Sequence, residues 1–296
     1  TNICLIQLMT GYIRIKSPWV QLGIFLLVFS PQLALLAFSL FRQPEVTIDF
    51  NDPGAIGQLK WMQAFSSLTF FLVPAFLYAV FSFRGRYGYF LGLKAAQKQN
   101  MYVLAILCLL LSMPSVFWLG ALNEQINLPE WMSSLEQSSS EQMKAFLSVN
   151  KPVDVVINVI VIALLPAFCE EIFFRGAMQR IMIHLTRNPW AGIIITAILF
   201  SALHLQFAGF LPRMFLGTVL GMLYWYSGSL WTSIAAHFVY NGVQVIWAAF
   251  TPTFATSNPE TTMLAVVASA VAVAAILLYY RRQSVSSFAK VYGEGE

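Results

Sequence analysis

The chain has 296 residues, of which 58% are hydrophobic and 10% are charged, with a mean hydropathy of +0.69. Soluble domains usually carry about 25% charged residues, so this composition excludes a soluble globular protein and predicts a polytopic membrane protein. The net charge of +4 is modest, and no basic stripe indicates a nucleic-acid partner. Cys4, Cys108 and Cys169 are too few and too scattered for a disulfide framework.

Eight apolar segments predict an all-α fold, a membrane bundle of about eight transmembrane helices. Several of them reach the roughly 20 residues that a helix needs to cross a hydrocarbon core. In chain order the segments cover residues 18–41, 63–83, 101–121, 153–174, 189–207, 210–227, 229–250 and 262–280. The longest polar connection, residues 123–154, is expected to contain an amphipathic helix that lies along the membrane surface.

The charges of the connecting loops predict how the helices are oriented, because Lys and Arg are retained on the cytoplasmic side. One set of connections holds Arg14, Lys16, Arg84, Arg86, Lys94, Lys98, Arg175, Arg180, Arg187, Arg281 and Arg282. The alternate set holds Glu45, Asp49, Asp52, the acidic stretch after Asn123 and Glu260, with the bases Arg42, Lys60, Lys144 and Lys151. This majority bias predicts that both termini lie in the cytoplasm.

A few ionisable or amide side chains interrupt the predicted spans. An ionisable group near the bilayer centre costs about 2.5–3.5 kcal/mol, so each one indicates a functional role. They are Glu170, Glu171 and Arg175 in the fourth span, His204 in the fifth, Arg213 at the start of the sixth, and His237 with Asn241 in the seventh. We expect Arg213 to extend to the outer interface and the Gly217-xxx-Gly221 pattern to mark close helix packing.

Helical geometry predicts different neighbours for the two adjacent glutamates. Glu171 and Arg175 are four residues apart, so they share a helix face and can form an ion pair. Glu170 is rotated by about 100° and is left available for chemistry. Pro166 has no N–H to donate, so we expect a bend beside Glu170. The helical rise allows Glu170 and His204 to lie at matching heights on antiparallel neighbours.

These side chains together suit the activation of water. A carboxylate beside a histidine can take a proton from water and make it a nucleophile. A second histidine with an asparagine amide can stabilise an oxyanion, worth about 10²–10³ in rate for each donor. The pattern predicts a hydrolase without a serine or cysteine nucleophile. The alternative, a Cys169 thiolate with His204 as its base, is disfavoured because no motif position requires the thiol.

Three motifs in order resemble the CPBP family, the CAAX proteases and bacteriocin-processing enzymes. The family pattern EExxxR reads Glu170-Glu171-Ile172-Phe173-Phe174-Arg175, FxxxH reads Phe200 to His204, and HxxxN reads His237 to Asn241. The resemblance covers roughly residues 153–250, as the catalytic core of a single membrane domain over residues 1–296. Residues 1–152, with three helices and the polar connection, lie outside it.

The resemblance implies an intramembrane endopeptidase of the glutamate type that acts on a membrane-associated protein or peptide. By this resemblance Glu170 and His204 activate water, His237 and Asn241 hold the oxyanion, and Glu171 with Arg175 shapes the site. No cofactor is favoured. The zinc alternative would use Glu170, His204 and His237 as ligands.

Two further alternatives are a proton-coupled transporter and a non-catalytic immunity or scaffold protein that binds a partner in the bilayer. Short loops and compact size favour a prokaryotic plasma membrane. The sequence gives no indication of the oligomeric state or of a particular substrate.

Overall fold

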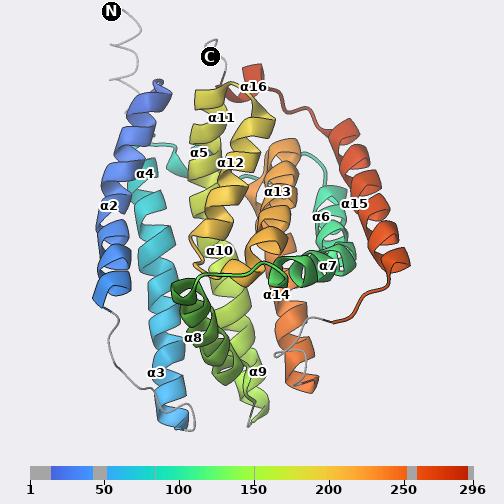
Figure 1. Cartoon of the computed structure of the whole chain (residues 1–296). Helices are drawn as coiled ribbons and strands as arrows, with labels where there is room; N and C mark the ends of the chain where they lie inside the picture. The colour runs from blue at the N-terminus through green and yellow to red at the C-terminus, as the bar shows by residue number, and fades with distance from the viewer. Residues whose placement is uncertain (1–14, 43–51, 84, 150, 252–258, 293–296) are drawn as a thin grey trace, which may run out of the picture.

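In the computed structural model, residues 15–42, 52–83, 85–149, 151–251 and 259–292 are described. Every regular element within these ranges is a helix (Figure 1). The N-terminal elements are α2 (Pro18–Arg42), α3 (Pro53–Ser67), η1 (Leu68–Leu72), α4 (Val73–Ser82), α5 (Tyr87–Leu91), α6 (Asn100–Leu111), α7 (Met113–Glu124) and α8 (Glu130–Leu147).

The elements that carry the three motifs follow. They are α9 (Pro152–Asn158), η2 (Val159–Leu164), α10 (Leu165–Glu171), η3 (Ile172–Gln179), α11 (Arg180–Thr186), α12 (Pro189–Ala202), η4 (Phe207–Gly209), α13 (Phe210–Ser227) and α14 (Leu230–Phe250). The chain continues through α15 (Met263–Gln283) and α16 (Phe288–Tyr292). The start of α2 and the short α16 lie at the same end of the bundle (Figure 1).

Among the described residues, six helical segments are long and apolar enough to cross a membrane, so the chain is an integral membrane protein. They are Pro18–Ser39, Gly54–Ser82, Asn100–Glu124, Pro152–Thr186, Phe207–Ser227 and Met263–Gln283. The other two predicted spans form helices as well. However, α12 has only 14 residues, and α14 is not among the six although it has 21.

The helical segments of the second and fourth predicted spans are longer than expected, from residue 53 and to residue 186, while the fifth ends early and the third is divided. The fifth was expected to continue to residue 207, but α12 ends at Ala202, so His204 follows the helix rather than lying on it. The third is divided at Ser112, whose hydroxyl donates to the Leu109 carbonyl at 2.6 Å. Pro114 in the next turn has no N–H to continue the ladder. Helix α7 therefore lies across the direction of α6 (Figure 1).

The fourth span is a single long helical segment, Pro152–Thr186, with two wide π-helical stretches. The first, η2, ends two residues before Pro166, where the ring removes a backbone donor. The second, η3, follows Glu171 directly. π-Helical turns are uncommon and are found often at functional sites. Both stretches flank the pair of glutamates.

The N-terminal helices pack against both sides of the elements that carry the motifs. On one side an aromatic cluster joins α2 and α4 to η3, with Phe25 and Phe29 of α2 at 5.0 and 4.8 Å from the Phe173 ring. On the other side α6, α7 and α15 pack against α13 and α14. There the Ser115 hydroxyl donates to the Ser269 hydroxyl at 2.8 Å. The other helices thus cover the motif helices on two sides.

The predicted amphipathic helix is present as α8. It packs against the connection between α12 and α13, where the Trp131 and Phe207 rings are 5.6 Å apart. In addition, the Glu136 carboxylate accepts a hydrogen bond from the backbone N–H of Ala208 at 3.1 Å. Its position on a membrane surface stays a prediction.

Candidate active site

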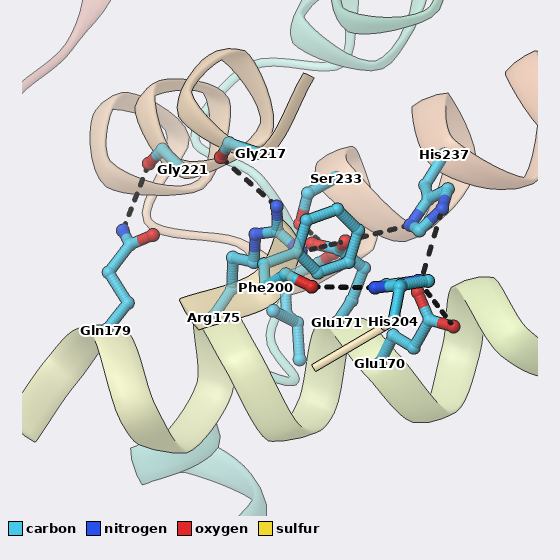
Figure 2. A network of polar contacts seen from close by, with 11 residues as sticks. Glu170, Glu171, Arg175, Gln179, Phe200, His204, Gly217, Gly221, Ser233 and His237 are labelled. Carbon is cyan, nitrogen blue, oxygen red and sulfur yellow. Dashed lines mark hydrogen bonds and ion pairs between the residues drawn. The ribbon is translucent and has the colours of Figure 1, made fainter. Parts of the chain in front are cut away.

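The three motifs bring Glu170, His204 and His237 together, as the sequence predicted. Glu170 lies on α10, His237 on α14, and His204 in the turn after α12 (Figure 2). The Glu170 Oε1 atom is 3.9 Å from His204 Nε2, and its Oε2 atom is 4.0 Å from His237 Nε2. The carboxylate therefore stands between two imidazoles. Its side chain is 10% exposed, against 23% for His204 and 8% for His237.

Glu171 forms the predicted ion pair and a second contact that the sequence did not indicate. Its Oε1 atom accepts from Arg175 Nη1 at 2.7 Å and from His237 Nδ1 at 2.9 Å (Figure 2). Glu171 and Arg175 are completely buried. One carboxylate oxygen thus neutralises the arginine and orients the imidazole of His237 toward Glu170.

His204 is oriented by its own backbone. The Nδ1–H donates to the Phe200 carbonyl oxygen at 2.6 Å, and a carbonyl can only accept. In the neutral imidazole, Nε2 is then an acceptor and faces Glu170. The Phe200 ring lies edge-on to the His204 ring, with centroids 4.9 Å apart, and beneath the Arg175 guanidinium at 4.6 Å. Phe200 therefore links the ion pair to the second motif.

Two side chains of η3 bind backbone carbonyls of α13. Arg175 Nη2 donates to the Gly217 carbonyl, and Gln179 Nε2 donates to the Gly221 carbonyl, each at 3.1 Å (Figure 2). A Cβ atom at Gly217 would lie 3.2 Å from Ala197, and one at Gly221 would lie 2.7 Å from the Gln179 side chain. The predicted role of this glycine pair in close packing is confirmed. Gln179 is a site residue that sequence reasoning missed, although its four-residue spacing from Arg175 was visible.

Arg213 binds the segment that follows α12, and its expected position at the outer interface stays a prediction. Its Nη1 donates to the Gln206 side chain at 2.8 Å, and its Nη2 donates to the Gln206 backbone carbonyl. Gln206 lies two residues after His204, so the arginine is bound to the segment that carries this histidine. Between them, Leu205 has a left-handed backbone with φ of 54°. Such a conformation costs about 1–3 kcal/mol and persists only when its surroundings impose it.

Asn241 lies one helical turn after His237 on α14 and is partly buried. No hydrogen bond of its side chain is found within the described part of the chain. The structure therefore places Asn241 on the same face as His237 without bonding it to the cluster. Cys169 is fully buried beside Glu170 in the sequence and takes part in none of these contacts.

Among the residues that the structure describes, no group of three or more His, Cys, Asp and Glu side chains is arranged to hold a metal ion. The atoms facing one another across Glu170 are 3.9 and 4.0 Å apart. Ligand atoms about 2.0–2.1 Å from a tetrahedral zinc ion would lie closer to one another than this.

The comparison with protein families confirms the predicted resemblance over part of the chain. Residues 152–243 match the model of the type II CAAX prenyl endopeptidase Rce1-like family. All three motifs fall inside this segment, which resembles the membrane-bound CAAX proteases. One similar curated protein is the uncharacterized protein YpbD of Bacillus subtilis strain 168, which is 30% identical over 90 residues.

That alignment covers 29% of this chain and 43% of YpbD, so the chain spans less than half the length of this relative. No solved structure matches the chain.

The buried ion pair makes a prediction about stability. In Glu171→Gln, the Arg175 guanidinium loses its neutralising partner, which typically costs about 3–5 kcal/mol for a buried pair. Replacing both members with neutral side chains, in Glu171→Gln with Arg175→Met, removes the uncompensated charge. We expect the thermal unfolding midpoint in detergent to fall strongly in the single variant and to recover in the double variant. Glu141→Gln, on the exposed face of α8, is the control. If the unfolding midpoint of the double variant fell by the sum of the falls in Glu171→Gln and Arg175→Met alone, this coupling would be contradicted.

Proposed function

We propose that this protein is an intramembrane endopeptidase that hydrolyses a peptide bond of a membrane-associated protein or peptide. The observation that supports it best is the Glu170 carboxylate, buried between two imidazole Nε2 atoms at 3.9 and 4.0 Å. The match of residues 152–243 to the CAAX endopeptidase family favours the same reaction class. Function follows here from the site and not from the helical bundle, since one fold can host many activities.

In the proposed mechanism, Glu170 and His204 hold the attacking water. Their facing atoms are 3.9 Å apart, beyond the range of a direct hydrogen bond. A water at about 2.8 Å from each atom would bridge them at an angle of roughly 90°. It would donate one O–H to the carboxylate and the other to the unprotonated His204 Nε2. Both of its lone pairs then remain free to attack a carbonyl carbon.

His237 and Asn241 would stabilise the oxyanion. His237 Nδ1 donates to Glu171, so the ring can also donate from Nε2 only as the imidazolium. In that form the Nε2–H would be the first donor to the oxyanion. The Asn241 amide is one turn away and would supply a second donor.

The reaction then completes without another co-reactant. Glu170 takes a proton from water as the oxygen adds to the carbonyl carbon. It gives that proton to the amide nitrogen as the C–N bond breaks. The products are a carboxylic acid and an amine, which ionise to a carboxylate and an ammonium group when they reach water.

The first test compares cleavage of a membrane-tethered reporter peptide by wild type, Glu170→Gln and the control Glu141→Gln. Loss of a general base typically costs about 10²–10⁴ in rate, so we expect kcat to fall at least about 100-fold in Glu170→Gln. The control should match wild type because Glu141 is exposed on α8. Equal processing by all three proteins would exclude the protease and favour a non-catalytic immunity or scaffold role.

The second test concerns zinc. Both histidines use Nδ1 for an internal hydrogen bond, which is also how zinc-bound imidazoles are held. We propose metal-free chemistry because the atoms that face one another across Glu170 are farther apart than the ligands of a tetrahedral zinc ion. The expected result is that purified protein contains less than one zinc ion per ten chains and cleaves the reporter at an unchanged rate after chelation. Stoichiometric zinc, with activity lost on chelation and restored by zinc, would assign the metalloprotease instead.

We also propose eight crossings, with both chain ends in the cytoplasm of a prokaryotic plasma membrane. The distribution of Lys and Arg supports this orientation, and the bacterial relative supports a prokaryotic membrane. In intact cells, we expect a membrane-impermeant maleimide to label Glu141→Cys but not Lys98→Cys, in a background without the native cysteines. Both positions are exposed. Labelling of Lys98→Cys alone would indicate the opposite topology.

A further inference from the structure

We propose that Asn123 of α7 is a positioning residue for His204. This inference rests on the proposed function, because it gives His204 a part in catalysis. Asn123 lies in the half of the chain that the family match leaves out. It would connect that half directly to the reaction.

His204 belongs to a connection that is not held by a regular helix. We call residues 203–209, between α12 and the start of α13, the His204 connection. It contains the left-handed Leu205 and the single turn of η4. It ends at Gly209, the N-cap of α13, which has no side chain to bind the first N–H groups of that helix. The connection therefore depends on contacts from elsewhere.

Asn123 supplies two of these contacts. Its side chain is buried, at 3% exposure. Its Nδ2 donates to the Phe207 carbonyl at 2.8 Å, and its Oδ1 accepts from the Leu211 N–H at 2.8 Å. One amide thus joins the second half of the His204 connection to the first turn of α13. It takes the place of the side-chain cap that Gly209 lacks.

Other elements bind the same connection at different points. Ser201 at the end of α12 donates to the Phe210 carbonyl at 2.7 Å. Arg213 binds Gln206, and Glu136 of α8 accepts from the Ala208 N–H. Asn123 is buried like Ser201, and it differs from all three in using both its donor and its acceptor. Its loss would therefore leave the partly buried Leu211 N–H without this acceptor and the Phe207 carbonyl with only the Phe210 N–H as its donor.

The position of the His204 ring depends on this backbone. Within the ring, Nδ1 is fixed to Phe200, the last helical turn before the connection. The backbone that carries His204 then continues into Leu205, Gln206 and Phe207. A shift of this segment would move Nε2 away from Glu170, and misplacement of a catalytic group by about 1 Å can cost roughly 100-fold in rate.

The three histidines of the chain allow a test that does not depend on cleavage. Protein labelled with ¹³C at histidine Cε1 gives three signals, from His184, His204 and His237, which substitution of each histidine assigns. We expect Asn123→Leu to shift or broaden the His204 signal while the other two keep their positions. Asn123→Asp keeps the acceptor for the Leu211 N–H and loses the donor to Phe207, so it should give a smaller change and is the second variant if Asn123→Leu does not fold.

Ser115→Ala is the matched control. It removes a side-chain hydrogen bond of the same helix, from α7 to α15, on a face away from His204. We expect all three histidine signals to stay unchanged in this variant. In the reporter assay, Asn123→Leu should lower kcat at least about tenfold with KM within twofold, and Ser115→Ala should leave both constants unchanged.

Unchanged His204 signal and kcat in the folded Asn123 variants would overturn the proposal. Equal shifts of all three histidine signals would overturn it too, because they would indicate a general loss of structure. If Glu170→Gln cleaves the reporter like wild type, the proposed protease function fails, and the histidine spectra still decide whether Asn123 positions His204.

Discussion

The arrangement of the site depends on one carboxylate oxygen, Oε1 of Glu171, which binds both the Arg175 guanidinium and the His237 ring. A buried arginine is tolerated only when its charge is neutralised, and here the neutralising group also fixes an imidazole on another helix. Arg175 in turn binds the Gly217 carbonyl and covers the Phe200 ring. These contacts join α10, η3, α12, α13 and α14. As a result, Glu170, the residue next to Glu171, faces two histidines without binding either one directly.

The two halves of the chain contribute in different ways. Residues 152–243 contain both imidazoles that face Glu170, and they are also the segment with a recognisable family resemblance. The preceding helices enclose this segment through an aromatic cluster on one side and α6 and α7 on the other. Asn123 and Glu136 add polar contacts to the connection that carries His204. Enclosing helices of this kind can differ among relatives while the motifs are kept, since packing constrains shape more than identity.

Most of what could be predicted from the sequence rested on helical periodicity. The predicted span 210–227 coincides with α13, and the Glu171–Arg175 pair follows from four-residue spacing. The predicted end of the fifth span was wrong because Leu205 adopts a left-handed backbone without the glycine or asparagine that usually signals one. The contact of Arg213 with Gln206 could not be predicted from helical spacing, because Gln206 lies outside any helix. The contacts of Asn123 join residues 84 and 88 positions apart, which no local pattern reveals.

The π-helical stretch η2 separates the long fourth helix into two parts whose faces are set independently. An α-helix turns by about 100° for each residue, so a wider turn before Pro166 rotates everything after it relative to Asn158 and the rest of α9. The lower part of this helix can therefore change which residues meet α14 while the glutamates keep their direction. For the same reason, a one-residue deletion in η2 can be absorbed by a return to the ordinary α-helical turn, whereas a deletion in α10 before Glu170 would turn both glutamates by about 100° away from the histidines.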